Sequence, residues 1–122
     1  MTRLELKNYI LENYNASNDR PWSSFPDYEV FRHVNNQKWF AVIMNVSRGK
    51  FGLPGPGSID IVNFKCDPLM SGSFRSLPGL FPAYHMNKEK WISAALDGSV
   101  SEEAIKMLLE ISYDSTATPS RK

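Results

Sequence analysis

The stretch WFAVIMNV (39–46), SRGKFGLPGPGS (47–58), IDIVNFKC (59–66) places two apolar runs on either side of a loop. Both runs are rich in β-branched and aromatic residues, which is typical of strands. The four glycines and two prolines of residues 47–58 disfavour regular structure between them. We therefore expect two strands, 39–46 and 59–66, joined by an irregular loop.

Further strands are expected on either side of this pair. Residues 28–34 precede it after the turn signal of residues 35–38, and residues 91–96 end at the turn signal Asp97-Gly98. A short helix is expected between the strands at 59–66 and 91–96, with Asp67 as its cap and Pro68 at its first position.

Helices are expected at both ends of the chain. Thr2 and Glu5 form a T-x-x-E capping box, and Ser101 caps the last helix with Val100 and Ile105 placed as a hydrophobic staple. The apolar stripe of the first helix is Leu6, Ile10 and Tyr14, with Leu4 and Leu11 beside it. The stripe of the last helix is Ile105, Leu108, Leu109 and Ser112.

This order of elements predicts an α+β fold. Strands in the middle and long helices at the ends favour a single antiparallel sheet of four or more strands, with both terminal helices packed on one face. We expect one domain over residues 1–114, followed by a polar tail over residues 115–122.

Alternation along the strands separates two sheet faces. The more apolar sets are expected under the helices: Phe40, Val42, Met44 and Val46; Val62, Phe64 and Cys66; Ile92, Ala94 and Leu96. The other face would carry Trp39, Trp91, Ile43, Ile61, Asn63 and Lys65. Two tryptophans there indicate a binding surface, unless loop 47–58 covers this face or the face packs in a dimer.

The positive charge is concentrated in the middle of the chain. Residues 32–92 hold eight basic and three acidic side chains, a net charge of +5, whereas the whole chain carries +1. If these basic side chains form one surface, it would favour an anionic partner. If they are scattered and solvated, they indicate no particular partner.

Catalytic, metal and cofactor sites are not predicted. Neither His33 nor His85 stands in a nucleophile signature, and no cluster of ligands has metal spacing. Gly49-Lys50 is not followed by Ser or Thr, which excludes a nucleotide P-loop. Cys66 precedes a helix start, where a thiol can be activated, but its place on the core face favours an inert, buried thiol.

Length and composition predict one globular domain. The 122 residues contain no apolar run long enough for a membrane span, and the first residues lack the features of a signal peptide. A single cysteine favours a reducing, cytoplasmic setting.

Several short motifs resemble the MmcQ/YjbR family. They are NFKCDP (63–68), PAYHMNK (82–88), Trp91-Ile92, LDG (96–98) and ISY (111–113). The resemblance covers nearly the whole chain and implies a frataxin-like (CyaY-like) two-layer fold. It also implies DNA binding through a pair of wings. Two features depart from the family pattern: the polar tail, and a loop at 47–58 that is longer and richer in glycine.

Two functions from different classes follow, with an enzyme as the third. The first is non-enzymatic DNA binding, weak and salt-sensitive, through Arg48, Lys50, Lys65, Lys88, Lys90 and Trp91. The second is binding of a protein or small molecule by the sheet face that carries Trp39, Asn63 and Trp91. The loop with the most specific family motif is Tyr84, His85, Met86, Asn87 and Lys88.

Overall fold

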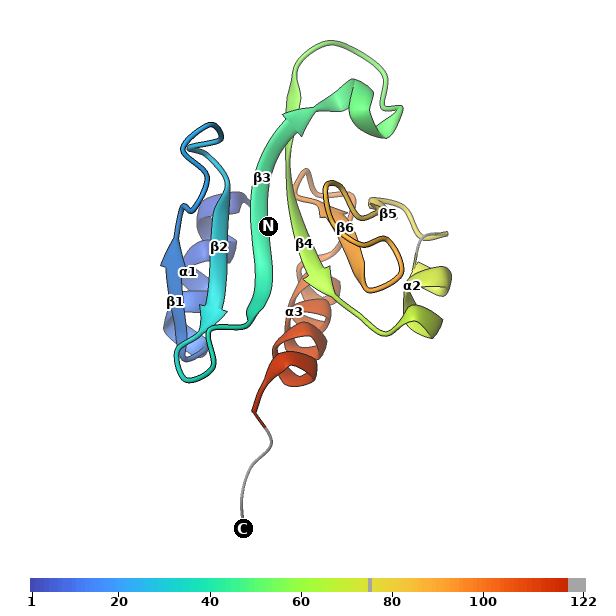
Figure 1. The fold of residues 1–122 in the computed structure, drawn as a ribbon. Helices are drawn as coiled ribbons and strands as arrows, with labels where there is room; N and C mark the ends of the chain where they lie inside the picture. Colours follow the sequence, from blue (N-terminus) through green and yellow to red (C-terminus); the bar gives the residue numbers. More distant parts are fainter. Residues whose placement is uncertain (75, 119–122) are drawn as a thin grey trace.

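The fold is an antiparallel sheet with helices on one face (Figure 1). The computed structural model describes residues 1–74 and 76–118. The elements in chain order are α1 (Arg3–Asn13), β1 (Ala16–Asp19), β2 (Glu29–His33), β3 (Trp39–Ser47), the 3-10 turn η1 (Arg48–Phe51), β4 (Ser58–Lys65), α2 (Pro68–Phe74), β5 (Leu80–Pro82), β6 (Trp91–Ala95) and α3 (Glu102–Thr116).

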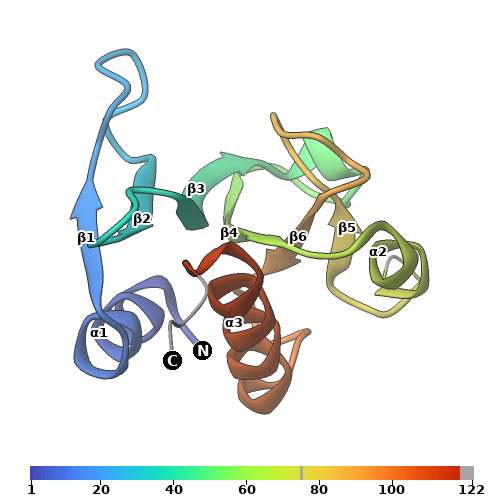
Figure 2. The same ribbon diagram turned by 60° about the horizontal axis from the view of Figure 1, so that its bottom comes forward.

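The sheet has six strands in the order β1-β2-β3-β4-β6-β5, and every neighbouring pair is antiparallel. Helices α1 and α3 lie on one face of it (Figure 2). This confirms the predicted α+β class. The edge strands β1 and β5 were not predicted, because three of the four residues of ASND are polar and LFP is only three residues long.

The main core lies between the sheet and the two terminal helices. The predicted caps are present: Thr2 and Glu5 form the capping box, and Ser101 Oγ accepts from Ala104 N at 3.1 Å. The fully or nearly fully buried members of this core include Leu6, Ile10, Phe31, Phe40, Ile43, Val62, Phe64, Ile92, Ile105 and Leu109. Leu4 and Leu11 of α1 were expected beside the buried stripe, but they are 65% and 44% exposed.

The prediction for the faces of β3 was wrong beyond Phe40. The β2–β3 register pairs Arg32 with Trp39 but Phe31 with Ala41, so a bulge places one extra residue, Phe40, in β3. The bulge shifts the alternation by one residue. Ile43 therefore faces the helices, whereas Val42, Met44 and Val46 face the opposite side.

That opposite side carries a second apolar cluster. Its sheet residues include Val30, Val42, Met44, Val46, Ile59 and Ile61. Phe51 and Leu53 pack against it from loop 47–58. This loop therefore covers part of the face, which was one of the alternatives to an open binding surface. Phe81 of β5 also packs against it, as do Trp22, Tyr84 and Met86 from other connections.

The C-terminal helix runs further than the predicted domain boundary at residue 114. Ser115 and Thr116 belong to α3, and Thr116 is 3% exposed. The Thr116 hydroxyl lies 2.7 Å from Nε2 of the buried His33, which ties the end of α3 to β2. Residues 119–122 of the predicted tail lie outside the described residues.

Candidate functional site

A cavity of about 380 Å³ opens on the sheet face opposite the helices. The sheet forms its floor, the segment between β1 and β2 forms one wall, and the connection between β5 and β6 forms the other; Figure 2 shows both connections on the side of the sheet away from α1 and α3. The lining side chains are Trp22, Phe25, Tyr28, Trp39, Val42, Met44, His85, Met86 and Asn87.

Four aromatic rings make up one side of the cavity. The Trp22 ring stands almost perpendicular to Trp39 (86°, centroids 5.4 Å apart) and to Tyr28 (80°, 5.9 Å). Phe25 stacks nearly parallel on Tyr28 at 4.8 Å. These edge-to-face and stacked pairs are favourable aromatic arrangements, and they orient the rings relative to one another.

A cation further orients Trp39. The Arg32 guanidinium carbon lies 5.4 Å from the centroid of the Trp39 ring. Two hydrogen bonds of 3.0 Å to the Asp19 carboxylate hold that guanidinium. Because Arg32 is thus paired and in place, Trp39 has a positively charged neighbour.

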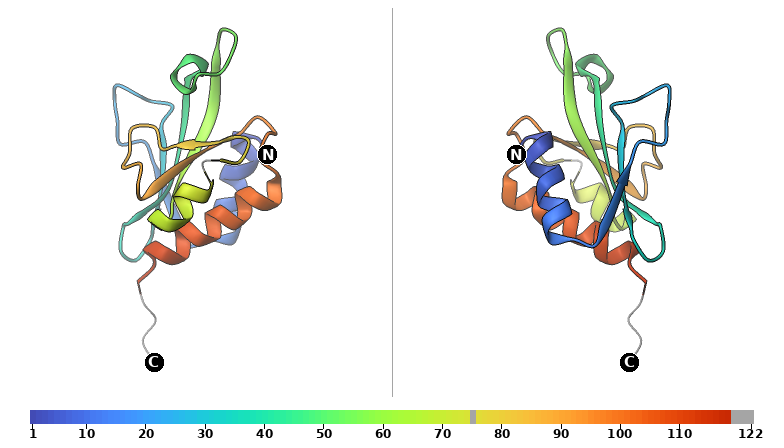
Figure 3. Two further views of the ribbon diagram at one scale, coloured as in Figure 1. Left: turned by 90° about the vertical axis from the view of Figure 1, so that its right-hand side faces the viewer. Right: turned by 90° about the vertical axis from the view of Figure 1, so that its left-hand side faces the viewer.

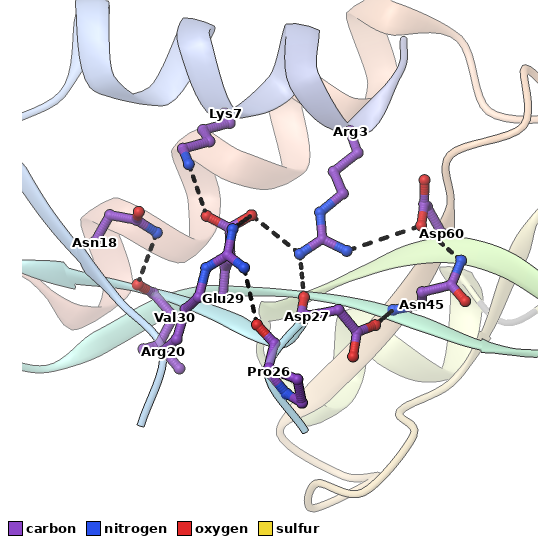
Figure 4. Close-up of polar contacts among 10 residues, drawn as sticks. All are labelled: Arg3, Lys7, Asn18, Arg20, Pro26, Asp27, Glu29, Val30, Asn45 and Asp60. Carbon is purple, nitrogen blue, oxygen red and sulfur yellow. Dashed lines mark hydrogen bonds and ion pairs between the residues drawn. The ribbon is translucent and has the colours of Figure 1, made fainter. Parts of the chain in front are cut away.

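The wall that carries Trp22, Phe25 and Tyr28 is anchored by an ion cluster around Glu29 (Figure 4). The Glu29 side chain is 3% exposed, and Arg3, Lys7 and Arg20 lie 3.0, 3.0 and 3.4 Å from its carboxylate. Arg3 also donates to Asp27 O. Arg20 donates to Pro26 O at 2.9 Å. Arg3 of helix α1 therefore pairs with Glu29 and also holds the backbone of the segment between β1 and β2.

The opposite wall is anchored by a buried polar network. Asn63 of β4 donates to Tyr84 O at 2.8 Å, and its carbonyl accepts from the Ser93 hydroxyl at 2.5 Å. Tyr84 N donates to Ser93 Oγ at 2.9 Å. Both Asn63 and Ser93 are fully buried. Asn63 was predicted to be a surface contact for a ligand; its buried position instead makes it a residue that positions the loop.

The tip of this loop has a constrained backbone. His85 has φ of 59°, in the left-handed region that few side chains adopt. Asn87 Oδ1 accepts from Glu89 N at 2.8 Å and from Lys90 N at 3.2 Å, which closes the turn before β6. The most specific family motif, Tyr84 to Lys88, thus forms a wall of the cavity through His85, Met86 and Asn87.

Replacing Asn63 by alanine is expected to lower the free energy of unfolding by about 1–3 kcal/mol, because Tyr84 O and the Ser93 hydroxyl lose their buried partner. The amide resonances of residues 84–88 should shift as well. Denaturant unfolding and amide spectra measure both effects. Asn13→Ala is the control, since the exposed Asn13 amide donates only to Tyr9 O on its own helix. An Asn63 variant as stable as the control would contradict the anchoring role.

The structure divides the predicted DNA-binding residues into two groups. Arg48 and Lys50 lie in η1, at the projecting end of the β3–β4 hairpin (Figure 3). Lys65 ends β4 and pairs in register with Trp91, while Lys65 and Lys90 line a small cavity of about 270 Å³. Lys65 lies at the end of β4 that is remote from this hairpin end.

Arg48 also has a structural contact. Its Nε donates to Pro54 O at 3.0 Å, within the loop that η1 opens. Lys88 lies in the β5–β6 connection, next to the aromatic cavity. The five predicted cations thus come from three segments of the chain: η1, the end of β4 and the β5–β6 connection. Trp91 does not line the aromatic cavity that contains Trp39.

Cys66 is 4% exposed and belongs to the main core. We expect it to resist alkylation in the native protein and to react on unfolding, because burial keeps the thiol from the reagent. Mass spectrometry after timed exposure to iodoacetamide, with and without denaturant, measures this. Rapid modification of the native protein near neutral pH would contradict it.

The described residues contain no group of three or more His, Cys, Asp or Glu side chains that could hold a metal ion. Within the same residues, none of the helices has the length and apolar character needed to cross a membrane.

Three residues of the cavity, Trp22, Phe25 and Tyr28, were missed from the sequence. The link before the strand predicted at 28–34 was interpreted as polar although it carries Trp22 and Phe25, and Tyr28 was placed at the start of that strand. This aromatic content between prolines was the available signal. Met44 was assigned to the wrong face because the bulge at Phe40 shifts the alternation of β3 by one residue.

The fold and the cavity define a small α+β domain with an aromatic pocket on its sheet. The YjbR family model matches residues 11–115, and the chain belongs to this family. The uncharacterized protein YyaQ of Bacillus subtilis (strain 168) is 42% identical over 116 residues, which cover 95% of this chain and 98% of YyaQ. This confirms the resemblance identified from the motifs.

Solved structures agree with this assignment. A crystal structure of a Pseudomonas syringae protein has a TM-score of 0.93 and 41% identity, and covers 96% of this chain and 100% of that one. A Deinococcus radiodurans protein at 23% identity has a TM-score of 0.68, covers 92% of this chain and 75% of that one, and shares the fold.

Proposed function

We propose that this chain is a non-enzymatic domain that binds a small molecule in the aromatic cavity. The observation that carries the proposal is the cavity itself: about 380 Å³, lined mostly by aromatic and apolar side chains and walled by two anchored segments. Ligand sites are typically concave, largely apolar and preformed, with volumes of about 300–1,000 Å³. The cavity meets each of these conditions.

The lining favours binding over catalysis. Among its residues, His85 is the one imidazole, and no carboxylate accompanies it to orient it as a base. The rings instead offer large apolar surfaces whose orientation is set before a ligand arrives, which reduces the entropy lost on binding. We place this activity in the cytoplasm, the setting that the single cysteine favours.

A titration with small ring compounds, followed by amide chemical shifts, tests the proposal. We expect shifts centred on residues 22–28, 39–44 and 85–87. Trp39→Ala should weaken binding by about tenfold or more, equivalent to about 1.4 kcal/mol. Trp91→Ala is the matched control, because Trp91 does not line the cavity. Shifts located elsewhere, or equal losses in the two variants, would contradict the proposal.

DNA binding is the second candidate, and the juxtaposition of Lys65, Lys90 and Trp91 favours it. Two cations can neutralise few phosphates, so we expect affinity on the order of micromolar or poorer, falling steeply with salt. Duplex and single-stranded oligonucleotides should be titrated at low and moderate salt. A loss of binding in a Lys65→Ala/Lys90→Ala variant would support this candidate. No binding at low salt would exclude it.

A further inference from the structure

We propose that the ligand of the aromatic cavity is a planar aromatic ring that carries an oxygen acceptor, a carbonyl or a carboxylate. This inference rests on the proposed function and names the class of ligand. It follows from the inventory of polar atoms on the lining side chains, which contains more hydrogen-bond donors than acceptors.

Three lining side chains supply donors that have no acceptor among the described residues. The indole nitrogens of Trp22 and Trp39 can only donate. Neither of them donates a hydrogen bond to any residue that the structure describes. The Asn87 side chain uses its oxygen to accept from Glu89 N and Lys90 N. Its amide nitrogen is left as a donor at the rim of the cavity.

Tyr28 adds a further hydroxyl group to the lining. Burial raises the pKa of Tyr28, and the nearby Tyr84 and Asp27 raise it further. The hydroxyl therefore stays protonated near neutral pH and can donate. A ligand that leaves such donors unpaired loses affinity, whereas one that offers them an oxygen gains it.

The charges around the cavity disfavour a cationic ligand. The lining includes no carboxylate. The nearby Asp19 carboxylate is already paired with Arg32 through two hydrogen bonds. A ligand ammonium group would therefore enter the cavity without a free acid of the lining to pair it. Aromatic walls can bind organic cations, so the absence of a carboxylate from the lining decides between the two chemistries.

The shape of the lining favours a flat ring. The stacked pair Phe25–Tyr28 and the perpendicular Trp22 present ring faces and edges, over a floor of Val42 and Met44. Thioether and aromatic groups both contact ring faces favourably. A planar ring therefore suits this lining, and an oxygen substituent on it can accept from the donors of the lining side chains.

A matched series of four probes tests the inference: toluene, benzamide, benzoate and benzylammonium, each titrated into the full chain and followed by amide shifts and tryptophan fluorescence. We expect benzamide or benzoate to bind at least about tenfold more tightly than toluene, with benzylammonium the weakest. The comparison of benzamide with benzoate distinguishes a carbonyl from a carboxylate ligand.

The variant Asn87→Asp separates the donor from the fold. Its carboxylate can still accept from Glu89 N and Lys90 N, but the amide donor is replaced by an acceptor. We expect the advantage of the neutral benzamide over toluene to fall by about tenfold, because the donor for its carbonyl is lost. Trp39→Phe, which keeps a ring and removes the indole N–H, should act in the same direction.

Different outcomes overturn different claims. Three results would show that the inference about the ligand class is wrong: toluene binds as tightly as benzamide and benzoate, benzylammonium binds best, or Asn87→Asp keeps the preference for benzamide over toluene. In each of these cases the cavity remains a binding site. If none of the four probes shifts the cavity residues at millimolar concentration, the proposed function fails together with the inference.

Discussion

Replacing Glu29 by alanine is expected to lower the free energy of unfolding by about 3–5 kcal/mol. The Glu29 carboxylate is almost fully buried and is the shared partner of Arg3, Lys7 and Arg20. Its removal would leave these cations close together without their acid, which is far more costly than the loss of an exposed ion pair. Denaturant unfolding followed by circular dichroism measures the change.

The control for Glu29 is Glu102→Gln in α3. Glu102 also pairs with a lysine, Lys106, at 3.2 Å, but its side chain is 53% exposed. We expect this change to cost less than about 1 kcal/mol. If Glu29→Ala does not fold, Glu29→Gln, which keeps the shape of the side chain and one acceptor oxygen but removes the charge, provides the measurement. A cost at Glu29 no larger than at Glu102 would show that the cluster does not anchor α1.

The same cluster predicts how stability depends on pH. Burial alone would raise the pKa of Glu29, but Lys7 and Arg3 outweigh it and hold the pKa below its ordinary value of 4.5. The unfolded chain therefore takes up this proton at a higher pH than the folded chain. The stabilisation is complete above the unfolded pKa and is lost as pH falls through the folded pKa. Unfolding curves below pH 5 should show a shallower loss for Glu29→Gln than for the wild type.

Local sequence signals were sufficient for the helices and the central strands. Thr2, Glu5 and Ser101 cap helices because their side chains satisfy backbone N–H groups within one turn, and such short-range chemistry can be predicted from sequence. The β3–β4 and β4–β6 pairs join strands that are apolar and long enough to be identified individually.

The bulge at Phe40 could not be predicted in this way. Its position depends on how β2 and β3 align, and nothing in residues 39–46 distinguishes a bulged strand from a regular one. One extra residue reversed the faces of Val42 and Met44, and these two side chains form the floor of the cavity. A local error in register therefore hid part of the candidate site.

The anchoring of the cavity walls was hidden for a different reason. Glu29 is 26 residues from Arg3, and Asn63 is 30 residues from Ser93. Pairs so distant in sequence meet only through the order of the strands and the docking of α1. The residues of the 84–88 motif were named as a group from the sequence, but their place in a wall of the cavity depends on this long-range packing.

Replacing Phe64 by alanine is expected to lower the free energy of unfolding by about 3–5 kcal/mol, the usual cost of truncating a core aromatic side chain. Phe64 is fully buried and lies in β4 between Ala41 of β3 and Ile92 of β6. Its ring belongs to the core that joins the sheet to α1 and α3. The truncation therefore leaves a cavity that the rigid central strands cannot collapse to fill.

Phe25→Ala is the matched control, since Phe25 is 46% exposed and stacks on Tyr28 at the edge of the aromatic cavity. It should cost less than about 1.5 kcal/mol in stability and weaken the binding of ring compounds instead. Phe64→Leu, which retains part of the buried volume, should fall between the wild type and Phe64→Ala. A cost below about 1 kcal/mol for Phe64→Ala would contradict the assignment of this face to the core. If Phe64→Ala and Phe25→Ala lower the free energy of unfolding equally, the helix-covered face of the sheet contributes no more to stability than the edge of the aromatic cavity.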